Sequence, residues 1–317
     1  MNQPPKRRSA DLSATSIAII SNNFMSAPRL FEAGRSSGIG SVNPHQAQRV
    51  SPAAMFDSIW SNRKLAVQMC KREVLGRYRG SIFGLAWSFF TPLLMLTVYT
   101  FFFTVVFKAR WGVSQEASHA NFAVVLFVGL IVHGLFSECI SRAPGLIQSN
   151  VTYVKKVVFP LEIFPWVAMG AALFHAAISV CVLLIAQLVL SGSISWTAIF
   201  FPIVLIPLLM VTMGFAWFLS ATGVYVRDIG QTIGLLMSVL LFVSPVFYPI
   251  SNLPPKVQMI VMLNPLTLII EESRNVLLYG KLPNWGALGI YAAIAMVIAW
   301  AGFWWFQKAR KGFADVL

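Results

Sequence analysis

Charged residues are scarce in this sequence, and acidic residues are scarcer still. Only 11% of the 317 residues are charged, whereas 57% are hydrophobic. Soluble domains carry about 25% charged residues, so the composition excludes a water-soluble enzyme and a disordered protein and indicates an integral membrane protein. The 24 Lys and Arg outnumber the 11 Asp and Glu. In a membrane protein, such an excess of basic residues is first explained by the positive-inside rule. We therefore do not expect nucleic acid as a partner.

Several catalytic and metal-binding patterns are also missing. The three cysteines form no CxxC pair, so neither a zinc site nor a disulfide framework is expected. The chain has no GxxxxGK[ST] phosphate-binding loop, no HExxH or GxSxG motif and no DxD-like acidic pair. These absences argue against a membrane-bound glycosyltransferase or lipid-modifying enzyme. We expect no catalytic residue, no metal site and no cofactor bound by this chain.

Ionisable residues are nearly absent from the apolar runs. Only His175 lies deep within one of them, and His133 lies nearer an end. A proton- or sodium-coupled transporter usually keeps an ionisable group at mid-membrane. A single neutral histidine more often forms an interhelical hydrogen bond than a proton relay. The sequence therefore indicates the membrane domain of a transporter that contains no evident ion-coupling or ATP-hydrolysing site of its own.

Long charge-free runs predict an all-α membrane protein. A helix needs about 20 residues to cross the hydrocarbon layer, and the run from Ile163 to Val226 is long enough for two crossings with a turn at 191–195. We predict six transmembrane helices, near residues 83–107, 120–140, 163–190, 198–223, 230–250 and 285–306. The apolar segment 257–270 is too short to cross, so it predicts short re-entrant helices before the last span.

The distribution of basic residues supports six crossings. With six spans, 19 Lys and Arg fall in cytoplasmic segments and 5 fall outside. Counting 257–270 as a seventh span moves the three C-terminal basic residues outside and weakens this bias. We therefore predict that both termini are cytoplasmic.

The N-terminal region has two parts of different character. Residues 1–51 are rich in Ser, Asn, Pro, Gly and Arg and predict a disordered cytoplasmic tail ahead of a transmembrane domain at 52–317. Residues 55–79 predict an amphipathic interface helix, whose apolar face contains Phe56, Ile59, Trp60, Val67, Cys70, Val74 and Tyr78. The alternative is a basic juxtamembrane anchor without a further mechanical role.

The predicted cytoplasmic loop at 141–159 is longer than a turn requires. Its apolar residues at 147, 151, 154 and 158 have helical spacing, and Pro160 separates them from the next span. A helix parallel to the membrane suits a docking surface for a soluble partner, although the pattern alone favours an ordinary solvated loop. Aromatic residues at the span ends likewise favour interfacial belts and packing over a surface along which sugars slide.

A series of short motifs resembles the polysaccharide-exporting ABC transporter permeases. These are the membrane subunits that export O-antigen, capsule and teichoic acid. The motifs follow one another over about 55–317: RYRGS at 77–81, GLAWS at 84–88, TPL at 91–93, VKKVVFPLE at 154–162, GVYVRDI at 223–229, SPVFYPI at 244–250, LNP at 263–265 and KGFADVL at 311–317. The first 50 residues lie outside the resemblance.

The resemblance implies an assembly and assigns parts to it. The chain would form a homodimer in the inner membrane with two copies of a separate ABC ATPase, which would bind ATP and Mg²⁺. Its cargo would be a lipid-linked polysaccharide, with O-antigen favoured over capsule or teichoic acid. The segment 251–282 would cap the outer mouth of a channel between the two copies.

The resemblance also implies roles for individual residues. ATPase coupling would involve Asn150, Tyr153, Lys155, Lys156, Phe159 and Glu162. The channel, which the resemblance places mainly on spans one and five, would be lined by Trp87, Phe90, Tyr99, Phe242, Phe247 and Tyr248. Our own hypothesis is that Arg77 and Arg79 serve substrate entry by attracting the phosphate of the lipid anchor at the inner leaflet. The competing hypothesis is an autonomous carrier or channel, which would need no ATPase.

Overall fold

The structure of the chain is a computed structural model that describes residues 51–106, 119–155 and 159–317. Within these ranges the chain forms helices and connecting segments, with no strand. This agrees with the all-α prediction. Residues 1–50, 107–118 and 156–158 lie outside the described part, and so do almost all of the predicted tail, the last residue of the predicted first span and Lys156.

Five helical segments are long and apolar enough to cross a membrane. They contain α3 (Trp87–Thr100) with the π-helix η2 (Phe101–Val106), α4 (His119–Arg142), α6 (Phe164–Ser191), α7 (Phe201–Tyr225) and α11 (Trp285–Ala309). Each coincides with a predicted span. Charge-free runs therefore located five of the six predicted helices.

The predicted fifth span contains a shorter helix than expected. Helix α8 (Ile229–Val243) has 15 residues, and the chain leaves it in an extended conformation at Ser244. Pro245 follows at once and cannot supply a helical N–H. The Tyr248 hydroxyl donates to the carbonyls of Phe242 and Val243, at 3.2 and 2.9 Å, and so satisfies the helix end. Six crossings remain a prediction, because α8 falls short of the usual span length.

Two short helices follow α8, where the sequence predicts a re-entrant segment. Helix α9 (Pro255–Met262) and helix α10 (Pro265–Leu277) are separated at Asn264, whose side chain caps α10 by accepting from the Leu266 N–H at 2.9 Å. Pro265 occupies the first helical position, where no N–H is needed. The break at Asn264-Pro265 therefore follows directly from local sequence.

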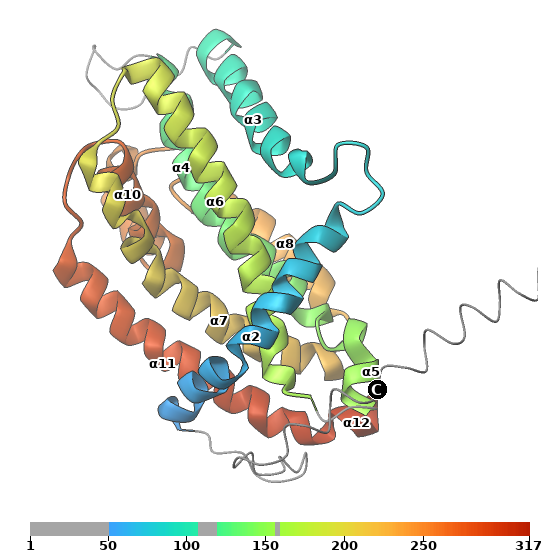
Figure 1. The fold of residues 1–317 in the computed structure, drawn as a ribbon. Coiled ribbons are helices and arrows are strands. Elements are labelled where there is room, and N and C mark those ends of the chain that lie inside the picture. The colour runs from blue at the N-terminus through green and yellow to red at the C-terminus, as the bar shows by residue number, and fades with distance from the viewer. Residues whose placement is uncertain (1–50, 107–118, 156–158) are drawn as a thin grey trace, which may run out of the picture. The chain divides into compact units, whose positions relative to one another are not determined.

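The helices define two ends of the described bundle (Figure 1). Helix α5 (Val151–Lys155) and helix α12 (Phe313–Val316) lie at one end, and α10 lies at the other. At the first end the Tyr225 hydroxyl donates to the carbonyl of Ala309 at 2.7 Å. At the second, the Thr197 hydroxyl donates to the carbonyl of Val276 at 2.6 Å. The segments that the charge argument assigns to opposite sides of the membrane thus lie at opposite ends.

Helices α7 and α11 pack closely because of two glycines. A Cβ atom added at Gly214 would meet the carbonyl of Ile298, and one added at Gly302 would meet the backbone of Gly214. Small residues permit such backbone approach between membrane helices, where van der Waals packing replaces the hydrophobic effect. This pair forms one side of the bundle (Figure 1).

Helix α2 (Pro52–Arg77) lies across α6 and occupies most of the segment 55–79, whose role as an interface helix remains a prediction. The close approach of Cys70 to Gly170 allows this crossing, since a Cβ at Gly170 would lie 2.6 Å from the Cys70 sulfur. The predicted apolar face does not pack as a unit. Val74 is buried, but Trp60 and Val67 are 70% and 68% exposed. The bundle covers one flank of the helix and leaves the other flank outside.

Candidate functional site

Four polar side chains from three segments meet beside the turn that follows α2. Arg77 closes α2, Tyr78 follows it, Glu138 lies in α4 and His175 lies in α6. The Arg77 guanidinium is 2.6 Å from Glu138 Oε1 and 3.2 Å from His175 Nδ1. His175 Nδ1 lies 2.9 Å from Glu138 Oε2, and the Tyr78 hydroxyl lies 3.1 Å from His175 Nε2. Every member of this polar cluster therefore has a partner within it.

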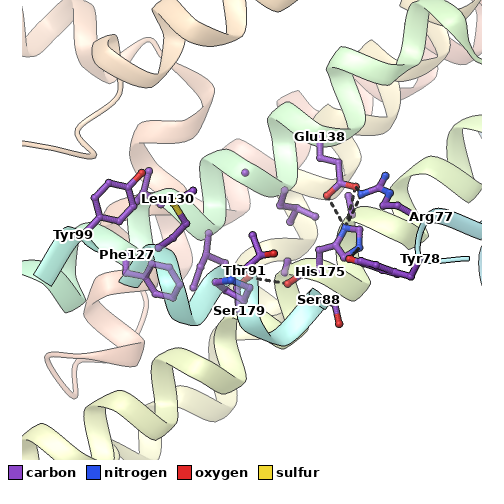
Figure 2. A pocket seen from close by; sticks show the side chains of 17 residues that line it. Arg77, Tyr78, Ser88, Thr91, Tyr99, Phe127, Leu130, Glu138, His175 and Ser179 are labelled. Atoms are coloured by element: carbon purple, nitrogen blue, oxygen red, sulfur yellow. Dashed lines mark hydrogen bonds and ion pairs between the residues drawn. The ribbon is translucent and has the colours of Figure 1, made fainter. Parts of the chain in front are cut away.

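The polar cluster forms one end of a cavity of about 420 Å³. Helix α3 closes another side of the cavity with Ser88, Thr91 and Tyr99. Figure 2 shows Arg77, Glu138 and His175 together at one end, with Tyr99 at the other. The cavity thus combines a charged end with hydroxyl and aromatic groups, which suits a ligand that has an anionic part and a polar part.

Two glycines set the path from α2 to α3 and so place α3 over this cavity. Gly80 and Gly84 have φ values of 87° and 49°. Residues with a Cβ rarely adopt positive φ, whereas glycine does so at little cost. Burial raises the pKa of the Tyr78 hydroxyl in this turn, so the phenol keeps its proton and remains able to donate or accept a hydrogen bond.

The two arginines predicted for substrate entry face different surroundings. Arg77 lines the cavity and is paired with Glu138, and its side chain is 36% exposed. Arg79 lines a separate surface hollow of about 440 Å³ together with Lys71 and Arg72. No acidic residue lines this hollow, so it offers an unneutralised basic surface. The two predicted arginines thus lie in different sites: Arg77 is ion-paired in the cavity, and Arg79 lies in a hollow without acidic lining residues.

The segment predicted to couple to an ATPase is built from short helices. After α4 come the 3-10 helices η3 (Ala143–Gly145) and η4 (Gln148–Asn150), and then α5. The Asn150 side chain is used internally, since it donates to the carbonyl of Leu146 at 2.9 Å. Lys155 is exposed, and Tyr153 is half-buried. Of the predicted coupling residues that the structure describes, Lys155 has the most accessible side chain.

Aromatic contacts join this segment to the start of α6. The Tyr153 ring lies 4.8 Å from that of Phe159, and Phe159 stacks on Phe164 at 5.2 Å. The Tyr153 hydroxyl accepts from Arg72 of α2 at 3.5 Å. Phe159 is buried, so its side chain supports α5 from within the protein.

Glu162 is held inside the protein as well. Its carboxylate pairs with Arg310 at 2.8 Å and also accepts from the Ser58 hydroxyl at 3.2 Å. Arg310 donates in addition to the carbonyl of Phe159 at 3.0 Å. The Glu162 carboxylate is thus buried and paired within the chain and is not exposed on the segment predicted to dock.

The residues predicted to line a channel lie on two helices and the turn after α8. Trp87, Phe90 and Phe242 are 44%, 46% and 67% exposed. Phe247 stacks on Phe242 with ring centroids 5.6 Å apart, and Tyr248 caps α8 as described. Tyr99 differs from these because it lines the cavity. Their exposure leaves apolar surface free for lipid or for a second copy of the chain.

Comparison with known proteins now adds an independent observation. Residues 65–278 match the model of the family described as "ABC-2 type transporter". The chain belongs to the ABC-2 type transporter family. The O-antigen export system permease protein RfbA of Myxococcus xanthus is 27% identical over 259 residues, which cover 81% of this chain and 96% of that protein.

Other relatives of this ABC-2 type transporter have related names. The O-antigen export system permease protein RfbA of Klebsiella pneumoniae is 26% identical over 255 residues, covering 80% of this chain and 95% of that protein. The polysialic acid transport protein KpsM of Escherichia coli is 22% identical over 234 residues, covering 73% and 88%. The resemblance found from short motifs is therefore confirmed.

Sequence reasoning did not anticipate the polar cluster of this ABC-2 type transporter. It placed Glu138 near a span end and considered His175 alone. The structure brings the two together across α4 and α6, and Arg77 contacts both of them (Figure 2). The one available signal was a carboxylate at the end of a long apolar run. Among the described residues, no group of three or more His, Cys, Asp or Glu is arranged to hold a metal.

Proposed function

We propose that this chain is the membrane subunit of an ATP-driven exporter of lipid-linked polysaccharide. The observation that carries the proposal is the family match over 65–278, together with relatives named as O-antigen and capsule polysaccharide export proteins. The missing phosphate-binding loop supports the assignment of ATP and Mg²⁺ to a separate ATPase. O-antigen-like cargo is favoured because the relatives described above with the highest identity have that name.

The assembly proposed for this function is a homodimer with two ATPase copies in the inner membrane. Both termini and α5 face the cytoplasm, and α8 completes six crossings. The exposed aromatic residues of α3 and α8 line a channel between the two copies, and α9 and α10 cap its outer mouth. The distribution of basic residues and the position of α5 and α10 at opposite ends of the bundle support this arrangement.

The coupling surface of the proposed exporter centres on α5. Lys155 projects from it as an exposed cation, and Tyr153 and Phe159 fix the helix from below. We expect Lys155→Glu, combined with Lys156→Glu, to lower ATP-driven export at least about tenfold, because reversed charges oppose a complementary partner surface. Export and ATPase co-purification from membranes are the measurements.

A matched charge reversal separates docking from general damage. Lys281→Glu changes an exposed lysine beyond α10, at the opposite end of the bundle, and is expected to leave export unchanged. Wild-type export from the Lys155→Glu, Lys156→Glu variant would contradict the coupling surface. The purified chain alone in liposomes provides the broader test, since transport without an ATPase would indicate an autonomous carrier and overturn the proposed function.

A further inference from the structure

The cation of Arg77 is accessible but already occupied. Its side chain is 36% exposed and borders the cavity, yet its guanidinium is 2.6 Å from a carboxylate oxygen of Glu138. Guanidinium groups bind carboxylate and phosphate with the same planar donor geometry. Any phosphate that reaches Arg77 must therefore compete with Glu138.

Glu138 has a second partner within reach. Its other oxygen lies 2.9 Å from His175 Nδ1, and the oxygen that faces Arg77 lies 3.0 Å from the same nitrogen. The remaining ring nitrogen of His175 lies 3.1 Å from the Tyr78 hydroxyl. A hydroxyl both accepts and donates, so Tyr78 is able to satisfy His175 Nε2 in either tautomer of the ring.

We propose that Glu138 is the resting occupant of an anion site on Arg77, and that a diphosphate headgroup displaces it from Arg77 and leaves it paired with His175 alone. In the resting state the Glu138 carboxylate contacts both Arg77 and His175. In the bound state Arg77 pairs with the diphosphate, and Glu138 keeps its contact with His175. The inference rests on the proposed function and names the part of a lipid-linked cargo that this cavity recognises.

The surroundings of the cluster contain few other charges. Helix α2 adds Glu73, which pairs with Arg142 of α4, and the α3 residues that line the cavity are uncharged. On α6, His175 is the one residue with a titratable side chain that lines the cavity. The basic hollow at Arg79 has no acidic lining residue and hence no resting occupant. The exchange therefore depends on Arg77, Glu138 and His175, with Tyr78 as the partner of His175 Nε2.

The test is direct binding of farnesyl pyrophosphate to the full chain in nanodiscs of phosphatidylcholine. Glu138→Gln removes the competitor and is expected to bind about fivefold tighter than wild type, as for loss of a partly exposed ion pair. Arg77→Gln is expected to lose at least about tenfold.

His175→Ala removes the second partner of Glu138 and supplies the readout that a purely structural role would not change. It is expected to weaken binding about threefold in the wild-type background, because Glu138 then has Arg77 as its remaining partner in the cluster, and to have no effect in the Glu138→Gln background. The matched controls are Glu73→Gln and Arg63→Gln, since both change charge on α2 outside the cavity, and both are expected to bind as wild type does. A Glu138→Gln variant that binds no tighter, or a His175→Ala change that weakens binding equally in both backgrounds, overturns the exchange.

Inorganic pyrophosphate distinguishes a lipid headgroup from a free anion. Tighter binding of farnesyl pyrophosphate is expected, and equal affinity for both probes overturns the assignment to a lipid. Because binding is measured without an ATPase, its outcome is separate from that of the export experiment. If the chain binds the two probes as expected but exports no polysaccharide, the proposed function is overturned and the anion site still stands.

Discussion

Replacing Arg274 with leucine is expected to destabilise the protein by about 3–5 kcal/mol, as when one partner of a buried charged network is removed. The Arg274 side chain is fully buried in α10. It donates to the carbonyl of Val125 in α4 at 3.2 Å, to that of Val246 after α8 at 3.1 Å, and to Glu271 at 2.8 Å. One side chain thus joins α10 to two other parts of the bundle, and leucine would leave these acceptors without their donor.

The measurement is the free energy of unfolding in detergent, with a second variant and a control. Arg274→Lys is expected to recover part of the stability, because an ammonium group cannot reproduce the guanidinium fork. Arg227→Leu is the matched control at an exposed position, with an expected change within about 0.5 kcal/mol. A loss below about 1 kcal/mol for Arg274→Leu would contradict the bridging role.

Helix positions could be predicted where they depend on residues that are close together in the sequence. Charge-free runs placed α4, α6, α7 and α11, and Asn264-Pro265 marked the break between α9 and α10. The end of α8 was less accessible to sequence reasoning. High hydropathy continues past Val243, whereas the helix stops before Pro245, and the Tyr248 hydroxyl donates to two carbonyls at its end, five and six residues earlier in the chain. A hydropathy window responds neither to the proline nor to these hydrogen bonds.

The polar cluster was not predictable because its members are far apart in sequence. Glu138 and His175 are separated by 37 residues, and Arg77 lies 61 residues before Glu138. Their meeting depends on the rotation of α4 and α6 about their axes and on the approach of Cys70 to Gly170. Arg274 gives a second example, since two of its partners are backbone carbonyls, which have no signature in the side-chain sequence.

The buried ion pair between Glu162 and Arg310 is expected to contribute far more than its more exposed counterpart at the same end of the bundle. The Glu162 and Arg310 side chains are 6% and 12% exposed, and the pair joins the start of α6 to the end of α11. We expect Glu162→Ala to cost about 3–5 kcal/mol, since it leaves a buried guanidinium without its counter-ion. The Trp217 indole still holds the backbone, because it donates to the carbonyl of Glu162 at 3.1 Å.

A double-mutant cycle isolates this pair from the rest of the segment. If the two side chains act on each other, Glu162→Ala with Arg310→Ala costs little more than either change alone, with a coupling energy of about 2–3 kcal/mol. The Glu73–Arg142 pair serves as the reference, because its side chains are 38% and 29% exposed and such pairs contribute about 0–1 kcal/mol. Additive costs at Glu162 and Arg310 would contradict the pairing. A measured coupling energy between Glu162 and Arg310, together with reduced ATPase co-purification in the single variants, would indicate that the C-terminal segment supports α5. Arg310 belongs to that segment and also donates to the carbonyl of Phe159.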